Sequence, residues 1–143
     1  MSLHGEYDTD NIFAKILRGE LPAVKVFEDD ETLAFMDVFP QSDGHVLVIP
    51  KARSRNILDT APDVLVDVIS KTQTLAKAVE KALSPDGIII TQFNGAPAGQ
   101  TVFHLHFHII PRYDDKTMGD HAKGQMADMG KLNLLADKIK AAI

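Results

Sequence analysis

Apolar and polar positions follow two periods along the chain, and together they predict a mixed α and β domain. The apolar run at 46–49 ends at Pro50 and is typical of a central strand. Apolar residues recur at helical spacing over 61–83, and Pro62 suits the first turn of a helix there. A Ser-Pro-Asp-Gly sequence at 84–87 ends this pattern, so we expect one long helix.

Shorter elements surround this helix. They comprise a short helix over 12–17 capped by Asp10 and Asn11, strands at 24–26 and 32–36, a buried strand over 88–93, a strand over 101–110 stopped by Pro111, an irregular stretch over 114–130 and a terminal helix over 132–143. Short loops join the first three strands, which favours antiparallel pairing over parallel βαβ units. The pattern therefore predicts an α+β fold with an antiparallel sheet, one long helix and shorter helices.

Composition narrows the classes of function. The 143 residues fit a single domain, and 45% of them are apolar, which is enough for one packed core. The formal net charge of −5 argues against a nucleic-acid binder, which needs a basic surface. The absence of cysteine excludes disulfides, thiolate nucleophiles and cysteine zinc sites. Residues 1–10 lack the apolar segment of a secretory leader and no apolar run could span a bilayer, so we expect a cytoplasmic protein with no membrane partner.

Three of the six histidines occupy alternate positions within one short stretch. If His104, His106 and His108 lie on one extended strand, their side chains share a face and stand roughly 6–7 Å apart. The intervening positions are apolar and would form the core face: Phe103, Leu105, Phe107 and Ile109. Three aligned imidazoles permit nucleophilic catalysis by the central ring, binding of a metal ion, or simply a polar, solvated strand face.

The loop before the histidines favours a phosphate ligand over a metal ion. Gly95 and Gly99 allow backbone N–H groups to approach an anion closely. The loop also offers neutral hydrogen-bond donors on Asn94, Gln100 and Thr101. A phosphate held there would lie beside the central histidine, and no neighbouring carboxylate completes a metal ligand set. An ordinary hairpin turn would also explain the loop.

The residues around the histidines resemble the histidine triad superfamily. The stretch 104–110 matches its signature, in which three alternating histidines are followed by apolar residues. Further stretches are similar to the bacterial branch close to the histidine triad nucleotide-binding (Hint-like) proteins: 11–16, 28–30, 34–37, 40–41 and 44–51. The resemblance covers about 10–113 and implies a single domain over 1–143, whose tail and helix at 114–143 are less similar. It also implies a five-stranded antiparallel sheet that continues across a homodimer.

The resemblance implies a role for each histidine of the site. His106 is the implied nucleophile, which attacks the α-phosphate of a nucleotide and forms a nucleotidyl-histidine that water then hydrolyses. His104 and His108 flank it, and His108 also reaches the phosphate. His45 lies nearby as a fourth histidine. Thr101 carries a hydroxyl that could pass a proton to the leaving group.

The resemblance also implies a nucleotide site. Asp37 would bind the ribose hydroxyls, because a carboxylate can accept two hydrogen bonds from a vicinal diol, with Val38 and Phe13 against the nucleoside. The implied phosphate contacts are Asn94, Gly99, Gln100, Thr101 and His108. The implied activity is that of a hydrolase or transferase acting on a purine nucleotide conjugate: a phosphoramidate, a dinucleoside polyphosphate or an aminoacyl adenylate.

One departure from the family pattern concerns metal. Many bacterial relatives carry a Cys-x-x-Cys pair that helps to bind a structural zinc, and this chain has Asn11 and Ala14 at those positions. We therefore expect no zinc site and no cofactor requirement. Two alternatives stay open: a nucleotide-binding regulatory module with vestigial catalysis, and a metal-dependent protein with the histidines as ligands.

Overall fold

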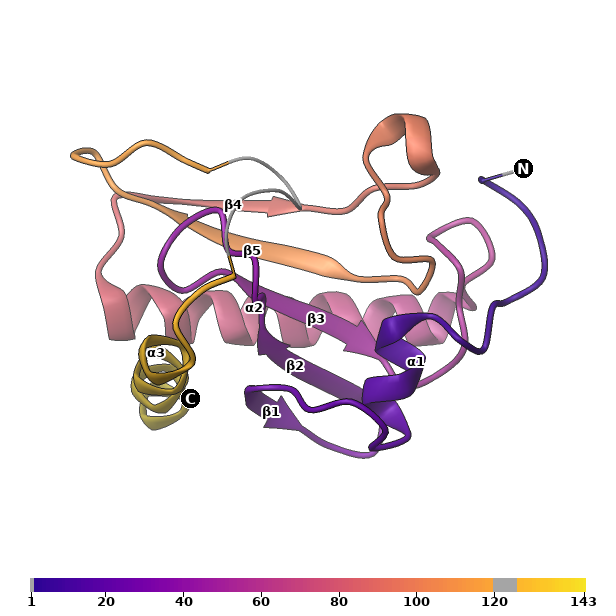
Figure 1. Cartoon of the computed structure of the whole chain (residues 1–143), viewed down its shortest axis with the longest axis horizontal. Helices are drawn as coiled ribbons and strands as arrows, with labels where there is room; N and C mark the ends of the chain where they lie inside the picture. Colours follow the sequence, from indigo (N-terminus) through magenta and orange to yellow (C-terminus); the bar gives the residue numbers. More distant parts are fainter. Residues whose placement is uncertain (1, 120–125) are drawn as a thin grey trace.

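Five antiparallel strands form one sheet, and a long helix runs along one of its faces (Figure 1). The computed structural model describes residues 2–119 and 126–143. In chain order the elements are α1 (Ile12–Leu17), β1 (Lys25–Glu28), β2 (Thr32–Met36), β3 (Val46–Pro50), α2 (Pro62–Leu83), β4 (Gly87–Thr91), the 3-10 turn η1 (Ala96–Ala98), β5 (Phe107–Arg112) and α3 (Met129–Ala142). The strand order is β1-β2-β3-β5-β4, and every neighbouring pair is antiparallel. The predicted α+β fold with its five-stranded antiparallel sheet is confirmed.

The two faces of the sheet are buried against different helices. Alternate residues of β2, β3 and β5 pack with α2 and α3 in the larger core cluster, which includes Ala34, Met36, Val46, Val48, Phe107, Ile109, Val68, Leu75, Val79 and Leu132. The intervening residues of β2 and β3 pack with α1 in a second cluster of Phe13, Leu33, Phe35, Leu47 and Ile49. Both strands are buried on both sides. Their odd-numbered positions point toward α1 and their even-numbered positions toward α2.

The helix ends follow the chemistry of their capping residues. The Oδ1 of Asn11 accepts a hydrogen bond from the N–H of Ala14 (2.9 Å), so Asn11 is the N-cap of α1. Ala61 precedes Pro62 at the start of α2, and Ser84 ends that helix in the left-handed conformation (φ 49°). Both predicted helices are confirmed at nearly the predicted bounds.

The strand predicted over 101–110 is shorter and lies further along the chain. Residues 101–106 form neither helix nor strand, and β5 begins only at Phe107. The prediction that Pro111 stops the strand is also wrong, because β5 continues through it. β3 pairs with β5 only as far as Ile109, so Pro111 has β4 on one side alone and its missing N–H can face the other side.

The strand predicted as buried over 88–93 is an exposed edge strand. Among the described strands β4 pairs with β5 alone, and its residues are half-buried or exposed. The exposed fraction of Ile90 is 47%. Three consecutive isoleucines are the pattern of a strand covered on both faces, but that pattern does not reveal whether the strand lies at the centre or the edge of a sheet.

The terminal helix begins at Met129 rather than at 132, because Asp128 provides an N-cap. The Oδ2 of Asp128 accepts a hydrogen bond from the N–H of Lys131 (3.0 Å). One face of α3 packs against α2 and β1 and buries four side chains: Leu132, Leu135, Ala136 and Ile139. The C-terminal region is thus part of the same core as the sheet.

The stretch predicted as irregular over 114–130 has neither helix nor strand at 114–119 and 126–128. Residues 120–125, which include His121, lie outside the described part of the chain. In the two described ranges no helix has the length and apolar character needed to cross a bilayer.

Candidate active site

His106 lies at the end of the irregular stretch 101–106, directly before β5. Its Nδ1 carries the ring proton, because this nitrogen donates a hydrogen bond to the carbonyl oxygen of His104 at 2.7 Å. In the neutral ring Nε2 then keeps its lone pair, which is the form that a nucleophile requires. The ring is buried, lines a cavity and meets the Phe13 ring at 90°, with centroids 4.9 Å apart.

His104 is fully buried and does not line that cavity. Its Nε2 donates to the carbonyl oxygen of Pro50 (2.8 Å), and its Nδ1 accepts from the hydroxyl of Tyr7 (2.6 Å). Burial lowers the pKa of His104, and the hydrogen bond to Pro50 offsets this shift only in part. The ring is therefore held neutral, with its proton on Nε2.

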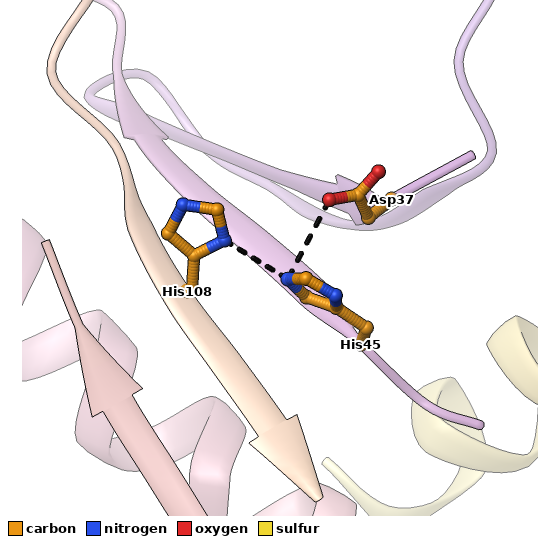
Figure 2. A group of neighbouring side chains, drawn as sticks. All are labelled: Asp37, His45 and His108. Carbon is orange, nitrogen blue, oxygen red and sulfur yellow. Dashed lines mark hydrogen bonds and ion pairs between the residues drawn. The ribbon is translucent and has the colours of Figure 1, made fainter. Parts of the chain in front are cut away.

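Asp37, His45 and His108 form a row of neighbouring polar groups beside His106 (Figure 2). The Nδ1 of His45 accepts from the backbone N–H of Gln41 (3.0 Å), so neutral His45 carries its proton on Nε2. That Nε2 donates to the Nδ1 of His108 at 2.9 Å and lies 3.5 Å from the Oδ2 of Asp37. The Nε2 of His108 consequently carries a proton, which an anionic ligand could accept.

The alternation of the strands brings these groups to one side of the sheet. Leu47 of β3 pairs with His108 of β5 and belongs to the cluster under α1, so His108 projects to the same face. His45 lies two positions before Leu47 and shares its face. Asp37 follows β2, and its N–H donates to the carbonyl oxygen of His45 (3.0 Å). The rings of His106 and His108 lie side by side, with centroids 5.0 Å apart, although of the triad only His108 lies on a strand.

A cavity of about 750 Å³ opens beside His106 and His108. Asp37 and the exposed Thr101 add polar groups to its lining. Apolar side chains form most of the remaining wall and include Ile12, Phe13, Ile16, Leu21, Phe35, Val38 and Phe39. A mostly apolar cavity with a few polar groups suits a ligand that joins a ring system to an anionic group.

Two predicted phosphate contacts have side chains that point elsewhere. The Oε1 of Gln100 accepts from the N–H of Gly95 (2.8 Å), and its Nε2 donates to the carbonyl oxygen of Arg55 (2.8 Å). The Oδ1 of Asn94 accepts from the N–H of Ile57 (2.9 Å). Neither side chain lines the cavity. Both amides brace the loop at 94–101, and their predicted contacts with phosphate stay predictions.

Gly99 allows this loop to pass close to the histidines. Its φ of 108° favours glycine, and a Cβ at this position would lie 3.3 Å from the ring of Phe93. The ring of Phe93 in turn contacts His108, with centroids 5.5 Å apart. The loop therefore rests against the site, and the predicted contact between Gly99 and phosphate stays a prediction.

Sequence reasoning missed three contributions to the site. Tyr7 reaches His104 from 97 positions away, and nothing in the local pattern links the two. Gln41 acts through its backbone N–H, which side-chain chemistry does not reveal. From the C-terminal region, Met129 and Asn133 line the cavity. They lie one helical turn apart on α3, a spacing visible in the sequence, but the spacing does not show what that face meets.

Two sets of residues bear on metal binding. The donor atoms of Asp37, His45 and His108 lie within 4.8 Å of one another, which is close enough for one ion. The hydrogen bond between the two imidazoles accounts for this approach without an ion. At the positions where the resemblance places a cysteine pair, Asn11 caps α1 and Ala14 offers no ligand atom, so these residues do not fit a zinc site.

Known proteins with similar sequences place the chain in a family. Residues 18–115 match the HIT domain. The chain is 44% identical over 103 residues to an adenylylsulfatase of Arabidopsis thaliana, a match that covers 72% of this chain and 52% of that protein. It is 34% identical over 134 residues to an adenosine 5′-monophosphoramidase of Candida albicans, covering 90% of this chain and 88% of that protein. The chain thus spans about half the length of the plant protein and most of the yeast protein.

Solved structures agree with this placement. A Hit-like protein from Bartonella henselae has a TM-score of 0.89 and 49% identity, covering 96% of this chain and 100% of that chain. A zinc-bound histidine triad family protein from Mycobacterium smegmatis has a TM-score of 0.80 and 30% identity, covering 94% and 93%. The chain belongs to the histidine triad (HIT) family.

The buried neutral state of His104 predicts a loss of stability in mild acid. Its pKa is lowered in the folded state relative to the ordinary value of 6.5, so the unfolded chain binds this proton first as the pH falls. The free energy of unfolding should begin to fall as the pH drops through 6.5. The fall should continue, by at most about 1.4 kcal/mol per pH unit, until the pH reaches the lowered folded pKa. Urea unfolding at a series of pH values measures this slope.

Two variants isolate the contribution of His104 to this slope. His104→Gln removes this titrating group and should make the curve less steep, whereas His4→Gln, at an exposed histidine, should leave it as in the wild type. If His104→Gln does not fold, NMR titration of the ring in the wild type measures the same pKa. An unfolding free energy that is constant from roughly pH 7 to pH 5 would contradict the expectation.

Proposed function

We propose that this protein hydrolyses or transfers nucleotides by attack of His106 on the α-phosphate of a purine nucleotide conjugate. The observation that carries the proposal is the 2.7 Å hydrogen bond from the Nδ1 of His106 to a backbone carbonyl, because it keeps the lone pair on Nε2 of a ring that lines the cavity. Candidate substrates are a phosphoramidate, a dinucleoside polyphosphate and an aminoacyl adenylate, since each joins an α-phosphate to a leaving group.

The proposed reaction has two displacements at phosphorus. In the first, Nε2 of His106 forms a bond to phosphorus while the bond to the leaving group breaks, and the leaving group takes that electron pair and a proton that the exposed Thr101 hydroxyl relays from solvent. In the second, water attacks the nucleotidyl-histidine and the electron pair of the P–N bond returns to Nε2. The proton of the water passes to solvent, and a nucleoside monophosphate leaves. In a transferase reaction another nucleophile takes the place of water.

The other groups of the site fit this proposal by their charge and direction. The N–H of His108 is directed by the bonds through His45 to Gln41, and it would donate to a phosphoryl oxygen as negative charge develops there. Asp37, which is mostly buried, would accept hydrogen bonds from the ribose hydroxyls. Phe13 and the neighbouring apolar wall would pack against the nucleoside.

Replacing the nucleophile tests the proposal. His106→Ala should lower kcat for an adenosine phosphoramidate by at least about a thousandfold, because the first displacement loses its attacking atom. Release of AMP measured by chromatography gives kcat and KM, and urea unfolding confirms that the variant folds. His4→Ala, at an exposed histidine, is the matched control and should keep wild-type rates. Wild-type turnover by His106→Ala would end the mechanistic claim.

A second variant restores the missing ring from outside. His106→Gly should hydrolyse a nucleoside 5′-phosphoimidazolide, because the imidazole of that substrate can occupy the space of the deleted side chain. Failure of a folded His106→Gly protein to do so would count against the assignment.

The rival function is a nucleotide-binding regulatory module with negligible turnover. Both functions predict binding of a purine nucleotide, so binding alone does not separate them. Mass spectrometry after a rapid quench without acid should find one nucleotidyl group on His106 if the protein is an enzyme. Tight binding with no such adduct and no turnover would favour the regulatory module.

We further propose that the phosphoryl step requires no metal cofactor. Asn11 and Ala14 do not fit a zinc site, and the Nε2 of His45 already donates a hydrogen bond to the Nδ1 of His108. Treatment with EDTA should leave kcat within about twofold of the untreated enzyme, since no charge needed by the transition state would be removed. Elemental analysis of protein purified without an affinity tag is the companion measurement. Stoichiometric zinc together with loss of activity in EDTA would overturn this proposal.

We also propose that β4 continues the sheet into a second copy of the chain. An edge strand with exposed isoleucine is a template for pairing with another strand, and α2 exposes Val66 and Ile69 (69% and 47%). Sedimentation should give a dimer for the wild type. Ile90→Lys should shift the protein toward a monomer, whereas Leu134→Lys, at an exposed leucine of α3, should not. A monomeric wild type would refute the homodimer.

A further inference from the structure

The N-terminal segment crosses the part of the chain that carries the triad. Its carbonyl oxygen at Ser2 accepts from the Nε of Arg55 (3.1 Å), and its Tyr7 hydroxyl reaches the Nδ1 of His104 (2.6 Å). The guanidinium of Arg53 lies 5.8 Å from the centre of the Tyr7 ring. Tyr7 meets the ring of His104 at 72° and is half-buried there. This segment therefore contacts His104 outside the cavity, since neither Tyr7 nor His104 lines it.

His104 lies in a stretch that the sheet does not hold. Residues 101–106 precede β5, so strand pairing does not orient the carbonyl of His104; in the same peptide group the N–H of Leu105 donates to the carbonyl oxygen of Ser54 (2.8 Å). The ring is instead held at both nitrogens, by Pro50 and by Tyr7. The carbonyl of the same residue accepts the Nδ1 proton of His106, so the contacts that hold the His104 ring and its peptide group together orient the acceptor for the next ring.

We infer that Tyr7 is a positioning residue for the nucleophile: its hydroxyl holds the ring of His104, and His104 in turn holds the proton on Nδ1 of His106. The direction of the first bond follows from chemistry, because neutral His104 gives its one ring proton to the Pro50 carbonyl and can only accept on Nδ1. Burial raises the pKa of Tyr7, so its hydroxyl keeps the proton that it donates. The inference rests on the proposed nucleophilic role of His106.

Tyr7→Phe removes the hydroxyl and little else. We expect kcat for an adenosine phosphoramidate to fall about tenfold while KM stays within about twofold, because the lost bond orients the nucleophile and does not contact the substrate. Tyr113→Phe is the matched control. The hydroxyl of Tyr113 also donates to one acceptor, the carbonyl oxygen of Asp43 at 2.8 Å, but it lies beyond the other end of β5. Its removal should leave both kinetic constants at the wild-type values.

A merely structural role of Tyr7 would lower stability without changing the tautomers or hydrogen bonds of the imidazole rings, so these are measured directly. Long-range ¹H–¹⁵N NMR spectra distinguish imidazole nitrogens that carry a proton from those that carry a lone pair. In the wild type and in Tyr113→Phe, His106 should show a single form with its proton on Nδ1. In Tyr7→Phe it should show a mixture of the two tautomers, and the Nδ1 of His104 should shift to the position of a nitrogen that accepts no hydrogen bond.

The outcomes separate this inference from the proposed function. Tyr7→Phe with wild-type kcat, with a loss confined to KM, or with unchanged ring spectra would overturn the positioning role. A loss of kcat and stability equal to that in Tyr113→Phe would overturn it as well. If the wild type turns over no nucleotide conjugate, the proposed function fails, and the ring spectra alone then decide whether Tyr7 orients His106.

Discussion

One backbone acceptor governs the chemistry of this protein: the carbonyl oxygen of His104, which takes the Nδ1 proton of His106. A carbonyl cannot donate, so it permits only one tautomer of the neutral ring. The N–H of Gln41 has the opposite polarity. It can only donate, and it thereby sets the proton positions of His45 and His108 in turn. Two peptide groups thus fix which ring nitrogen carries the proton in His106 and in His108, the two histidines that line the cavity.

The two peptide groups act on the same site because the sheet brings residues that are distant in the sequence to one face. β2 and β3 are buried on both sides, and the register that pairs Leu47 with His108 places this histidine beneath α1. A slip of one residue between β3 and β5 would turn His108 toward the core under α2 and present an apolar neighbour to the cavity instead. The packing of both faces therefore protects the site, since any slip would also expose core residues.

Much of this arrangement could be predicted where local chemistry decides it. The side chain of Asn11 caps α1 as expected, and the rings of His106 and His108 lie side by side as their alternation predicts. The same alternation wrongly extended the strand to 101–110, because an irregular stretch can also separate apolar from polar side chains. Amide side chains such as that of Gln100 can hydrogen-bond to a ligand or to the backbone equally well. Only the folded loop shows that the partners of Gln100 are backbone groups. The contact of Tyr7 with His104 depends on tertiary structure alone.

The HIT domain match spans residues 18–115 and so omits Tyr7, α1 and α3. Tyr7 donates to the ring of His104, and the two helices supply Phe13, Met129 and Asn133 to the cavity wall. Part of the cavity wall is therefore encoded outside the matched range, whereas His106, His108 and the rest of the wall lie within it. Substitutions at Phe13, Met129 or Asn133 would therefore reshape the cavity while His106 and His108 keep their positions in the chain.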